Sequence, residues 1–472
     1  MPPDITSLLN VDPSLPTTNP TTPYWLQPPH HLANAQSAHL PNTQDIVIIG
    51  SGITAASLAL TLLRKDPTCT ITLLEARTLC SGATGRNGGH LVTYGGASYS
   101  ALKELVGSEQ AIKVIDYTFK NIERTRELVS EFGGLEVEFR DVTRLRMFGS
   151  EQLHAAKESV AAYERDRGSM KGQYTFIDKE EARERYGVNN ANVTGVGVIR
   201  ASALWPYRLI TRIYDHLVCT YPSRFTLETN TPALSIEYNA TTFPSHPYTI
   251  ATPRGTIRST KVIHCTNGYA GHLLPLLRGA LYPNRGTMTV QDLGDRLPNH
   301  GQNTSWSLHS APQTRSGKVD SGMCYLQQNA LTGYFFIGGE KRTMEEAITS
   351  NDSEHNESSV LHLQDKLPRL FGLHPSKGDR LVSTWTGIMG YTADGLPLVG
   401  RLSSPITGRM GDGEYIAAGF NGMGMSMCIL AGEAIAQMIV GGDITKWFPE
   451  AFEISTERLR ERLNAGISVA KS

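Results

Sequence analysis

Residues 45–75 read DIVIIGSGITAASLALTLLRKDPTCTITLLE, and this stretch decides the fold. It opens with an apolar run, Ile46–Ile49, which is too short for a helix and predicts a strand buried on both faces. Apolar residues at helical spacing follow over Ile53–Lys65, and a second apolar run, Thr70–Leu74, ends in Glu75. The order strand, helix, strand predicts a βαβ unit in a parallel sheet.

The turn before the predicted helix carries a G-x-G-x-x-A pattern, made by Gly50, Gly52 and Ala55. In a dinucleotide-binding unit the first glycine permits the tight turn, the second lets the backbone approach a pyrophosphate, and the small third residue lets the helix pack closely on the strand. The helix N-terminus offers free N–H groups to phosphates, and Glu75 can accept hydrogen bonds from ribose hydroxyls. The alternative is a structural βαβ unit whose glycines only form a turn.

The composition excludes several kinds of partner. The 44 Lys and Arg residues balance 45 Asp and Glu residues, and this net charge of −1 predicts no binding to nucleic acid or to an anionic membrane. No apolar run reaches the roughly 18 residues of a membrane span. The N-terminal sequence lacks the basic and apolar regions of a secretory signal, and the six cysteines lack metal-site or redox spacing. We therefore expect a cytoplasmic protein with no metal site.

A glycine-rich loop follows Glu75 and reads SGATGRNGGH over residues 81–90. Its glycines disfavour a helix or a packed strand, and they let backbone N–H groups approach a flat ligand closely. Arg86, Asn87 and His90 add polar side chains beside the predicted nucleotide fold. A flexible surface loop is the alternative.

A second glycine-rich junction lies near the other end of the chain. A predicted strand, Tyr415–Ala418, leads into GFNGMGMS at residues 419–426, and a nearly all-apolar helix is predicted from Met425. A nucleotide fold split in this way suits FAD, whose flavin lies far from its adenine. The second helix start can then face the flavin edge where negative charge appears on reduction.

The segments between these junctions predict a second sheet and several loops. Strands are predicted at Phe225–Ile236, Thr256–Cys265, Leu281–Val290, Met323–Gln328 and Tyr334–Gly338, helices at residues 100–132, 151–167 and 207–219, and polar loops at residues 291–321 and 343–358. Residues 384–400 are punctuated by Gly and Pro.

Together these motifs resemble the D-amino-acid-oxidase superfamily of FAD-dependent oxidoreductases, and most of all its γ-glutamylputrescine oxidase-like and fungal branch. The resemblance rests on IIGSGITA, Glu75, SGATGRNGGH, CTNGYAGHLLP, GYTADGLPLVG and GFNGMGMS. It implies an α/β fold in which a Rossmann-like FAD-binding domain of the glutathione-reductase type joins a discontinuous α+β substrate domain on a mostly antiparallel sheet. We expect an extended arm at residues 1–44, the FAD-binding domain at 45–99, 200–284 and 376–445, the substrate domain at 100–199 and 285–375, and a C-terminal helical tail at 446–472.

The resemblance also implies the residues that bind FAD. They are Gly50, Gly52, Ile53, Thr54, Ala55, Glu75, Ala76, Arg77, Ser81, Gly82, Ala83, Thr84, Arg86, Asn87, Gly88, Gly89, Ala233, Thr266, Asn267, Gly268, Gly387, Asp394, Pro397, Gly419, Asn421, Gly422, Met423 and Gly424. Some relatives attach FAD to a cysteine in the C-terminal motif. Here that motif reads GIMGYTAD, so noncovalent FAD is expected.

The implied reaction is the oxidation of a C–N bond in an amine or amino acid, with hydride transfer to flavin N5 and O2 as the acceptor that yields H2O2. The alternatives are a dehydrogenase that passes electrons to another carrier, and an FAD-bound assembly protein without turnover. The candidate substrate-facing residues are His90, Tyr325 and Gln327, the last two on one face of a predicted strand by its period of two. Ordinary strand positions are the alternative for this pair. Arg285 could grip a carboxylate or could merely cap a loop.

Overall fold

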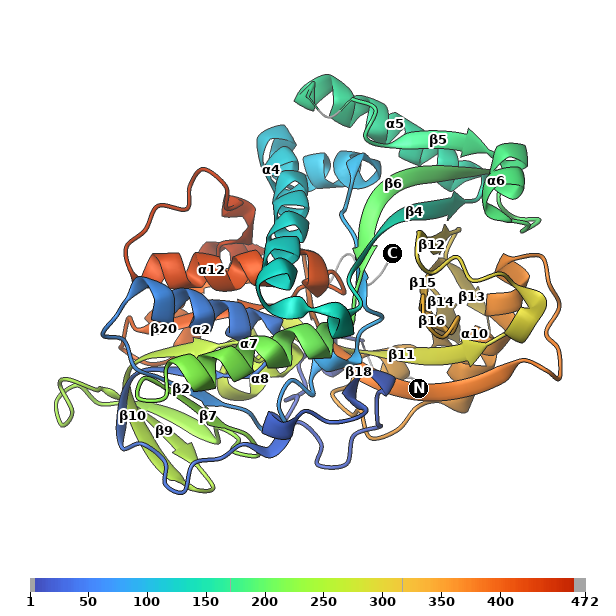
Figure 1. The fold of residues 1–472 in the computed structure, drawn as a ribbon. Coiled ribbons are helices and arrows are strands. Elements are labelled where there is room, and N and C mark those ends of the chain that lie inside the picture. Colours follow the sequence, from blue (N-terminus) through green and yellow to red (C-terminus); the bar gives the residue numbers. More distant parts are fainter. Residues whose placement is uncertain (1–4, 170, 316, 462–472) are drawn as a thin grey trace.

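A computed structural model describes residues 5–169, 171–315 and 317–461, and the strands of these residues form two large sheets and one small one (Figure 1). The first large sheet has the order β19-β20-β10-β1-β2-β7, with β8 and β9 added beside β10. Neighbouring strands from β20 to β7 run parallel, and β19 runs antiparallel to β20. The strands are β1 (Thr43–Ile49), β2 (Ile71–Leu74), β7 (Phe225–Glu228), β8 (Ser235–Tyr238), β9 (Tyr248–Thr252), β10 (Gly255–His264), β19 (Leu398–Arg401) and β20 (Glu414–Ala418).

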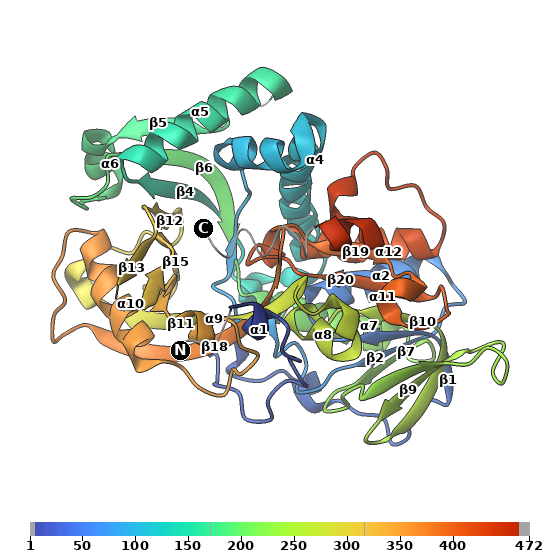
Figure 2. The ribbon, with the colours of Figure 1, turned by 180° about the vertical axis from the view of Figure 1, so that it is seen from behind.

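Strand β1 is buried on both faces, as its unbroken apolar run predicts. Ile46 and Ile48 pack into the core shared with helices α2, α7 and α12, while Val47 and Ile49 pack with β8, β9 and β10. Figure 1, and Figure 2 from behind, show α2, α7 and α12 together over one face of this sheet.

The helices differ greatly in length. They are α1 (Ile5–Leu9), α2 (Ile53–Lys65), α3 (Ala83–Arg86), α4 (Tyr99–Leu128), α5 (Ser150–Arg167), α6 (Lys179–Tyr186), α7 (Pro206–Thr220), α8 (Ala270–Leu273), α9 (Met344–Ala347), α10 (Glu357–Leu370), α11 (Ser404–Thr407) and α12 (Cys428–Ile439). None of the helices in the described part of the chain combines the length and the apolar character that crossing a bilayer requires.

The second large sheet has the order β18-β11-β16-β15-β12-β4-β6-β3, with β5 beside β6. Its pairs are antiparallel except β12 with β4. Its strands are β3 (His90–Leu91), β4 (Arg140–Phe148), β5 (Thr175–Asp178), β6 (Gly195–Ala203), β11 (Leu281–Asp292), β12 (Thr304–His309), β15 (Met323–Gln328), β16 (Phe335–Gly338) and β18 (Arg380–Thr392). The small sheet joins β13 (Gln313–Arg315), β14 (Lys318–Asp320) and β17 (Lys341–Arg342). The predicted fold class is confirmed: a parallel α/β sheet joins a mostly antiparallel one.

Three local predictions are wrong. The predicted strand Phe225–Ile236 is two strands, β7 and β8, because Asn230 turns the chain with a φ of 49°. The predicted loop 291–321 contains β12, a central strand, and the predicted loop 343–358 contains the short helix α9 and the first residues of α10.

The strand pairing also differs from the expected domain division, because β3 and the first residues of β11, 281–284, belong to the second sheet although the division places them in the FAD-binding domain. β6 and β18 belong to the second sheet, although their residues 200–203 and 380–392 were assigned to the FAD-binding domain. Of the expected helical tail, residues 446–455 form turns and a short 3-10 helix at Glu450–Phe452, and residues 456–461 are helical. Residues 462–472 lie outside the described residues.

The N-terminal arm lies deeper in the molecule than an extended surface arm. It forms α1 and two short turns of 3-10 helix, at Tyr24–Leu26 and His31–Asn34. The Trp25 ring is 1% exposed and stacks on Phe336 of β16 with 4.2 Å between ring centroids. The arm is therefore part of the contact between the two sheets.

A buried ion group joins β10 to β20 in the first sheet. Glu414 Oε2 lies 3.0 Å from His264 Nε2 and 2.6 Å from Arg409 Nη2. Burial alone would raise the pKa of this carboxyl, but the hydrogen bonds from Arg409 and His264 outweigh burial and lower the pKa of Glu414 to about 2.

Candidate active site

A cavity of about 900 Å³ is lined by residues of both large sheets. The first sheet contributes the turns that follow its parallel strands, with Gly50 after β1, Glu75 after β2, Thr266 after β10 and Asn421 after β20. The second sheet contributes residues of β3, β4, β11, β12, β15 and β18. Ligands of open α/β sheets bind at the carboxyl ends of the parallel strands, and this cavity lies at that edge.

The turn between β1 and α2 forms a backbone cradle at the cavity. Gly50 has a φ of 105°, and a Cβ there would lie 2.5 Å from the carbonyl oxygen of Cys265, so this turn requires glycine. Gly52 is the N-cap residue of α2, and the N–H of Ile53 donates to Thr84 Oγ1 at 3.0 Å. Gly52, Ile53 and Thr54 line the cavity, so the positive end of α2 faces it, as a helix start that binds a phosphate does.

The carboxylate of Glu75 is held in a fixed position at the end of β2. Its Oε2 accepts the N–H and the hydroxyl of Ser51 at 3.1 and 2.6 Å, and its Oε1 accepts the N–H of Arg77 at 2.9 Å. A carboxylate offers about four acceptor sites, so one remains for a ligand hydroxyl.

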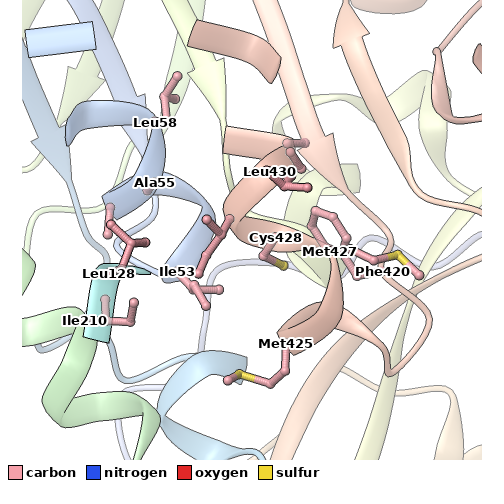
Figure 3. Close-up of a cluster of buried hydrophobic side chains, with 14 of the residues drawn as sticks. Ile53, Ala55, Leu58, Leu128, Ile210, Phe420, Met425, Met427, Cys428 and Leu430 are labelled. Atoms are coloured by element: carbon pink, nitrogen blue, oxygen red, sulfur yellow. The ribbon is translucent and has the colours of Figure 1, made fainter. Parts of the chain in front are cut away.

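The two glycine-rich helix starts meet although they lie far apart in the sequence (Figure 3). Helix α12 packs on α2 so closely that a Cβ on Gly432 would lie 2.4 Å from the carbonyl oxygen of Thr54. The Ser57 hydroxyl of α2 donates to the carbonyl of Ile429 at 2.7 Å. Figure 3 shows Ile53 and Ala55 beside Cys428 and Leu430. The turn before α12 consequently lines the same cavity as the turn before α2.

Most of the residues implied to bind FAD line this cavity. They are Gly50, Gly52, Ile53, Thr54, Glu75, Ala76, Arg77, Gly82, Ala83, Thr84, Arg86, Asn87, Gly88, Ala233, Thr266, Asn267, Gly387, Asn421, Gly422, Met423 and Gly424. These residues fit FAD, because a glycine cradle at a helix start, a fixed carboxylate and a second glycine-rich helix start surround one elongated space.

The other seven implied residues do not line the cavity. They are Ala55, Ser81, Gly89, Gly268, Asp394, Pro397 and Gly419. Asp394 pairs with Arg458 at 3.0 Å, and the Pro397 carbonyl accepts from the same guanidinium at 2.9 Å. A Cβ on Gly268 would lie 2.6 Å from a carbonyl oxygen of β18, so this glycine permits close packing.

Arg86 lines the cavity, but its guanidinium binds other parts of the chain. Its Nε donates to the Thr386 carbonyl of β18 at 2.6 Å, and its Nη2 donates to the Thr21 hydroxyl of the arm at 2.7 Å. Burial lowers the pKa of Arg86 to about 10, although Asp352 at 3.5 Å acts in the opposite direction. Arg86 therefore joins the glycine-rich loop to the arm and to the second sheet.

The three candidate catalytic residues have different surroundings. His90 lines the cavity, and its Nε2 lies 2.8 Å from Ser305 Oγ. Burial, together with Arg144 and Arg140, holds the pKa of His90 well below its usual value, so the ring is neutral. Tyr325 also lines the cavity, and burial raises the pKa of its phenol, which stays protonated.

The prediction that Gln327 faces the substrate does not agree with the structure. Its side chain is 2% exposed, does not line the cavity, and accepts a hydrogen bond from Arg140. Gln327 and Tyr325 do share a sheet face, but Gln327 lies further along β15, where Arg140 fills the space.

Arg285 also faces away from the cavity. Its guanidinium donates to the carbonyls of Glu346 and Asn351 at 3.2 and 3.1 Å. Because successive strand residues point to opposite faces, its neighbours Asn284 and Gly286 line the cavity instead.

Sequence reasoning missed two cavity-lining arginines, Arg144 and Arg146 of β4. The sequence RLR over residues 144–146 places the two arginines two residues apart, on one face of a strand, and this spacing was a usable signal. Sequence reasoning also missed Tyr94, which lies in the loop after β3, and His309 of β12.

The fold and the site define an FAD-dependent oxidoreductase. Residues 45–438 match the family model described as FAD dependent oxidoreductase, abbreviated DAO, so the chain belongs to this family. FAD is the cofactor of the family, in which noncovalent binding is typical.

The relatives found are distant but cover most of the chain. A probable oxidoreductase OrdL of Rhizobium meliloti is 24% identical over 414 residues, covering 84% of this chain and 83% of its own. The gamma-glutamylputrescine oxidoreductase of Escherichia coli is 22% identical over 440 residues, covering 90% of each chain.

Solved structures share the fold at low sequence identity. Glycine oxidase from Geobacillus kaustophilus has a TM-score of 0.66 at 17% identity, and the match covers 88% of this chain and 99% of that one. L-proline dehydrogenase from P. horikoshii has a TM-score of 0.65 at 20% identity, with 88% and 97% covered.

Proposed function

We propose that this protein oxidises a C–N bond of an amine or amino acid and that O2 accepts the electrons. The observation that carries the proposal is the continuity of the cavity, which runs from the nucleotide cradle of the first sheet to a polar, buried wall on the second. The relatives and the structures of similar fold include a gamma-glutamylputrescine oxidoreductase, a glycine oxidase and an L-proline dehydrogenase, and their names support this reaction class.

FAD, when bound, would accept the hydride, and with it the electron pair, that leaves the donor carbon. Gly52, Ile53 and Glu75 would hold its adenosine diphosphate part, and Asn87, Met423 and their neighbours its flavin part. The protein itself would contribute by positioning: it would hold the substrate in a buried space beside the flavin part of the cavity.

The uncharged side chains of His90 and Tyr325 suit a neutral amine. An ammonium group entering a buried cavity loses hydration, which lowers its pKa and favours the free amine that can give up a hydride. His90 is itself neutral, and Arg144 beside it disfavours a second cation there. We assign His90 and Tyr325 to substrate contact, with the Tyr325 hydroxyl, now 3.3 Å from Met288 Sδ, as a donor.

A dehydrogenase that passes electrons to another carrier is the second candidate, favoured by the similarity to the L-proline dehydrogenase. The rate at which the photoreduced flavin reoxidises in air distinguishes an oxidase from a dehydrogenase, because it is rapid in an oxidase and slow in a dehydrogenase.

The test of the proposed reaction is anaerobic bleaching of the flavin absorbance by N-methyl amines, D-amino acids, polyamine derivatives and cyclic imino acids. We expect at least one class to bleach the flavin with saturation kinetics. Protein that carries stoichiometric FAD and is bleached by none of them contradicts the proposal and favours a non-catalytic, FAD-bound assembly protein.

A further inference from the structure

We propose that the substrate is an anionic amine with at least two acidic groups, whose acidic end binds to Arg144 and Arg146 on β4. This proposal rests on the amine oxidation proposed above and narrows its substrate class.

Both arginines are on the cavity face of β4. They line the cavity at 7% and 8% exposure, while Leu145 and Met147 between and beside them pack into the core on the other face of the sheet. Residues two apart in a strand lie about 7 Å from each other, so the two side chains start from neighbouring positions. Arg144 pairs in register with Ser305, the residue that contacts His90. The arginines therefore lie next to the proposed substrate-contacting histidine.

Neither guanidinium has a carboxylate partner within 4 Å among the described residues. The other arginines of the cavity differ in this respect. Arg77 and Arg342 each have a carboxylate oxygen at 3.0 and 2.9 Å, and Arg86 has one at 3.5 Å. The wall at β4 therefore carries two positive charges that the described protein does not neutralise.

The hydrogen bonds around the pair leave donors free for a ligand. Arg144 Nε has no hydrogen-bond partner, and its two other nitrogens make only long bonds, to the Thr93 carbonyl at 3.4 Å and to Ser307 Oγ at 3.2 Å. The Thr93 hydroxyl, which is buried and belongs to the cavity wall, also lacks a partner. Buried polar groups in proteins are nearly always hydrogen-bonded, so these groups indicate a missing acceptor.

His309 does not supply part of the positive charge. Arg146 Nε lies 3.3 Å from His309 Nε2, and since a guanidinium can only donate, this ring nitrogen must accept. The Ser307 hydroxyl, 3.0 Å from the same nitrogen, then donates to it as well. The ring is neutral, and burial with Arg146 and Arg144 accordingly holds the pKa of His309 well below its usual value.

The charge of the wall sets the charge of the ligand. Burial, with Arg146 beside it, lowers the pKa of Arg144 to about 9, so it still carries its proton at neutral pH. An unpaired buried charge is costly, and a carboxylate that accepts both N–H groups of a guanidinium removes that cost. Two guanidinium groups match two carboxylates, or one doubly charged group, on a substrate whose amine arrives neutral.

The first test measures binding without turnover. Glutarate, a dicarboxylate without an amine, and glutaramide, its uncharged analogue, are titrated into the FAD-loaded protein, with calorimetry and the shift of the flavin absorbance as readouts. We expect glutarate to bind and glutaramide to bind at least about tenfold more weakly. Equal binding of the two probes overturns the proposal.

The second test assigns the site to the two arginines. R144Q and R146Q should each weaken glutarate binding about tenfold or more, and R146K, which keeps the charge, should weaken it less. R200Q is the matched control, because Arg200 lies on β6 of the same sheet but is exposed. Far-UV circular dichroism and FAD content verify that each variant folds. If R144Q and R146Q bind glutarate as tightly as R200Q does, the proposal is overturned. If the variants do not fold, the comparison of glutarate with glutaramide on unaltered protein still tests it.

The third test separates this proposal from the proposed function. N-methylglutamate should bleach the flavin at lower concentration than sarcosine, and putrescine, which has no acidic group, should not bleach it. If arginine-dependent glutarate binding occurs but no amine bleaches the flavin, the anion site stands and amine oxidation fails. If putrescine bleaches the flavin equally in unaltered protein and in R144Q, amine oxidation stands and the anion site fails.

Discussion

Replacing Gly52 by Asp places a negative charge at the proposed pyrophosphate site of FAD without a large change in the shape of the turn. Gly52 is the N-cap of α2 with φ −74° and ψ −177°, extended backbone that any residue adopts, and a Cβ there would meet only Thr84 Oγ1 at 3.1 Å. Asp is a favourable N-cap, better than Gly by only about a few tenths of a kcal/mol, so the apoprotein should keep its thermal stability. A carboxylate about 4 Å from a phosphate charge, however, repels it by about 4 kcal/mol at an effective dielectric constant of about 20. The Kd of FAD should therefore rise about a thousandfold.

The matched control is Gly52→Asn, which has nearly the same shape and capping ability without the charge. FAD is titrated into each apoprotein and followed by quenching of flavin fluorescence, with thermal unfolding of the apoproteins measured in parallel. We expect Asn to weaken FAD binding far less than Asp. Equal FAD affinities of the Asp and Asn variants would refute the assignment of this helix start to the pyrophosphate.

Three further changes address the cofactor cradle and the core. Glu75→Gln should weaken FAD binding about tenfold, because the amide cannot accept all the bonds of the carboxylate, and an unchanged Kd removes Glu75 from the site. Gly432→Ala should cost about 1–3 kcal/mol of stability in denaturant titrations, since its Cβ would overlap the Thr54 carbonyl, and unaltered stability would show that α12 shifts freely. The pKa of Glu414 is lowered from its ordinary 4.5 to about 2, so its contribution, about 3 kcal/mol, is present above pH 4.5 and is lost as the pH falls from about 4.5 to 2. Glu414→Gln should remove that part of the acid dependence of unfolding, and a variant with the same slope would contradict this assignment.

The cofactor half of the site was predictable because its signals are local. Gly50, Gly52 and Glu75 lie within one βαβ unit, where each residue type is required by the backbone path beside a nucleotide. Some residues that the resemblance implies to bind FAD do not line the cavity, and Asp394, which pairs with Arg458, is one of them. Sequence alone does not tell whether such a residue binds the cofactor or holds the protein together.

The substrate half was harder to predict because its strands carry polar residues on the cavity face. In β12 the residues Ser305 and Ser307 face the cavity side while Trp306 packs into the core, so the segment reads as a polar loop. In β18 the glycines suggest turns, yet Gly387 and Gly390 let Arg86 and Asn267 pack closely against the strand. A Cβ on Gly390 would lie 2.3 Å from Asn267 Oδ1. Arg86 and Asn267 both lie far from β18 in the sequence, and therefore no local pattern reveals why these two positions are glycine.

The order of strands in the first sheet has a consequence for biosynthesis. β1 is central, but one of its neighbours, β10, comes after about half of the chain, and β20 comes near its end. A nascent chain on the ribosome must therefore keep one edge of β1 unpaired until β10 has been translated, and one edge of β10 partly unpaired until β20 follows near the end of the chain. We expect chains truncated before Leu398 to aggregate and to appear in the insoluble fraction of a cell lysate, with chaperones bound to the N-terminal region during synthesis.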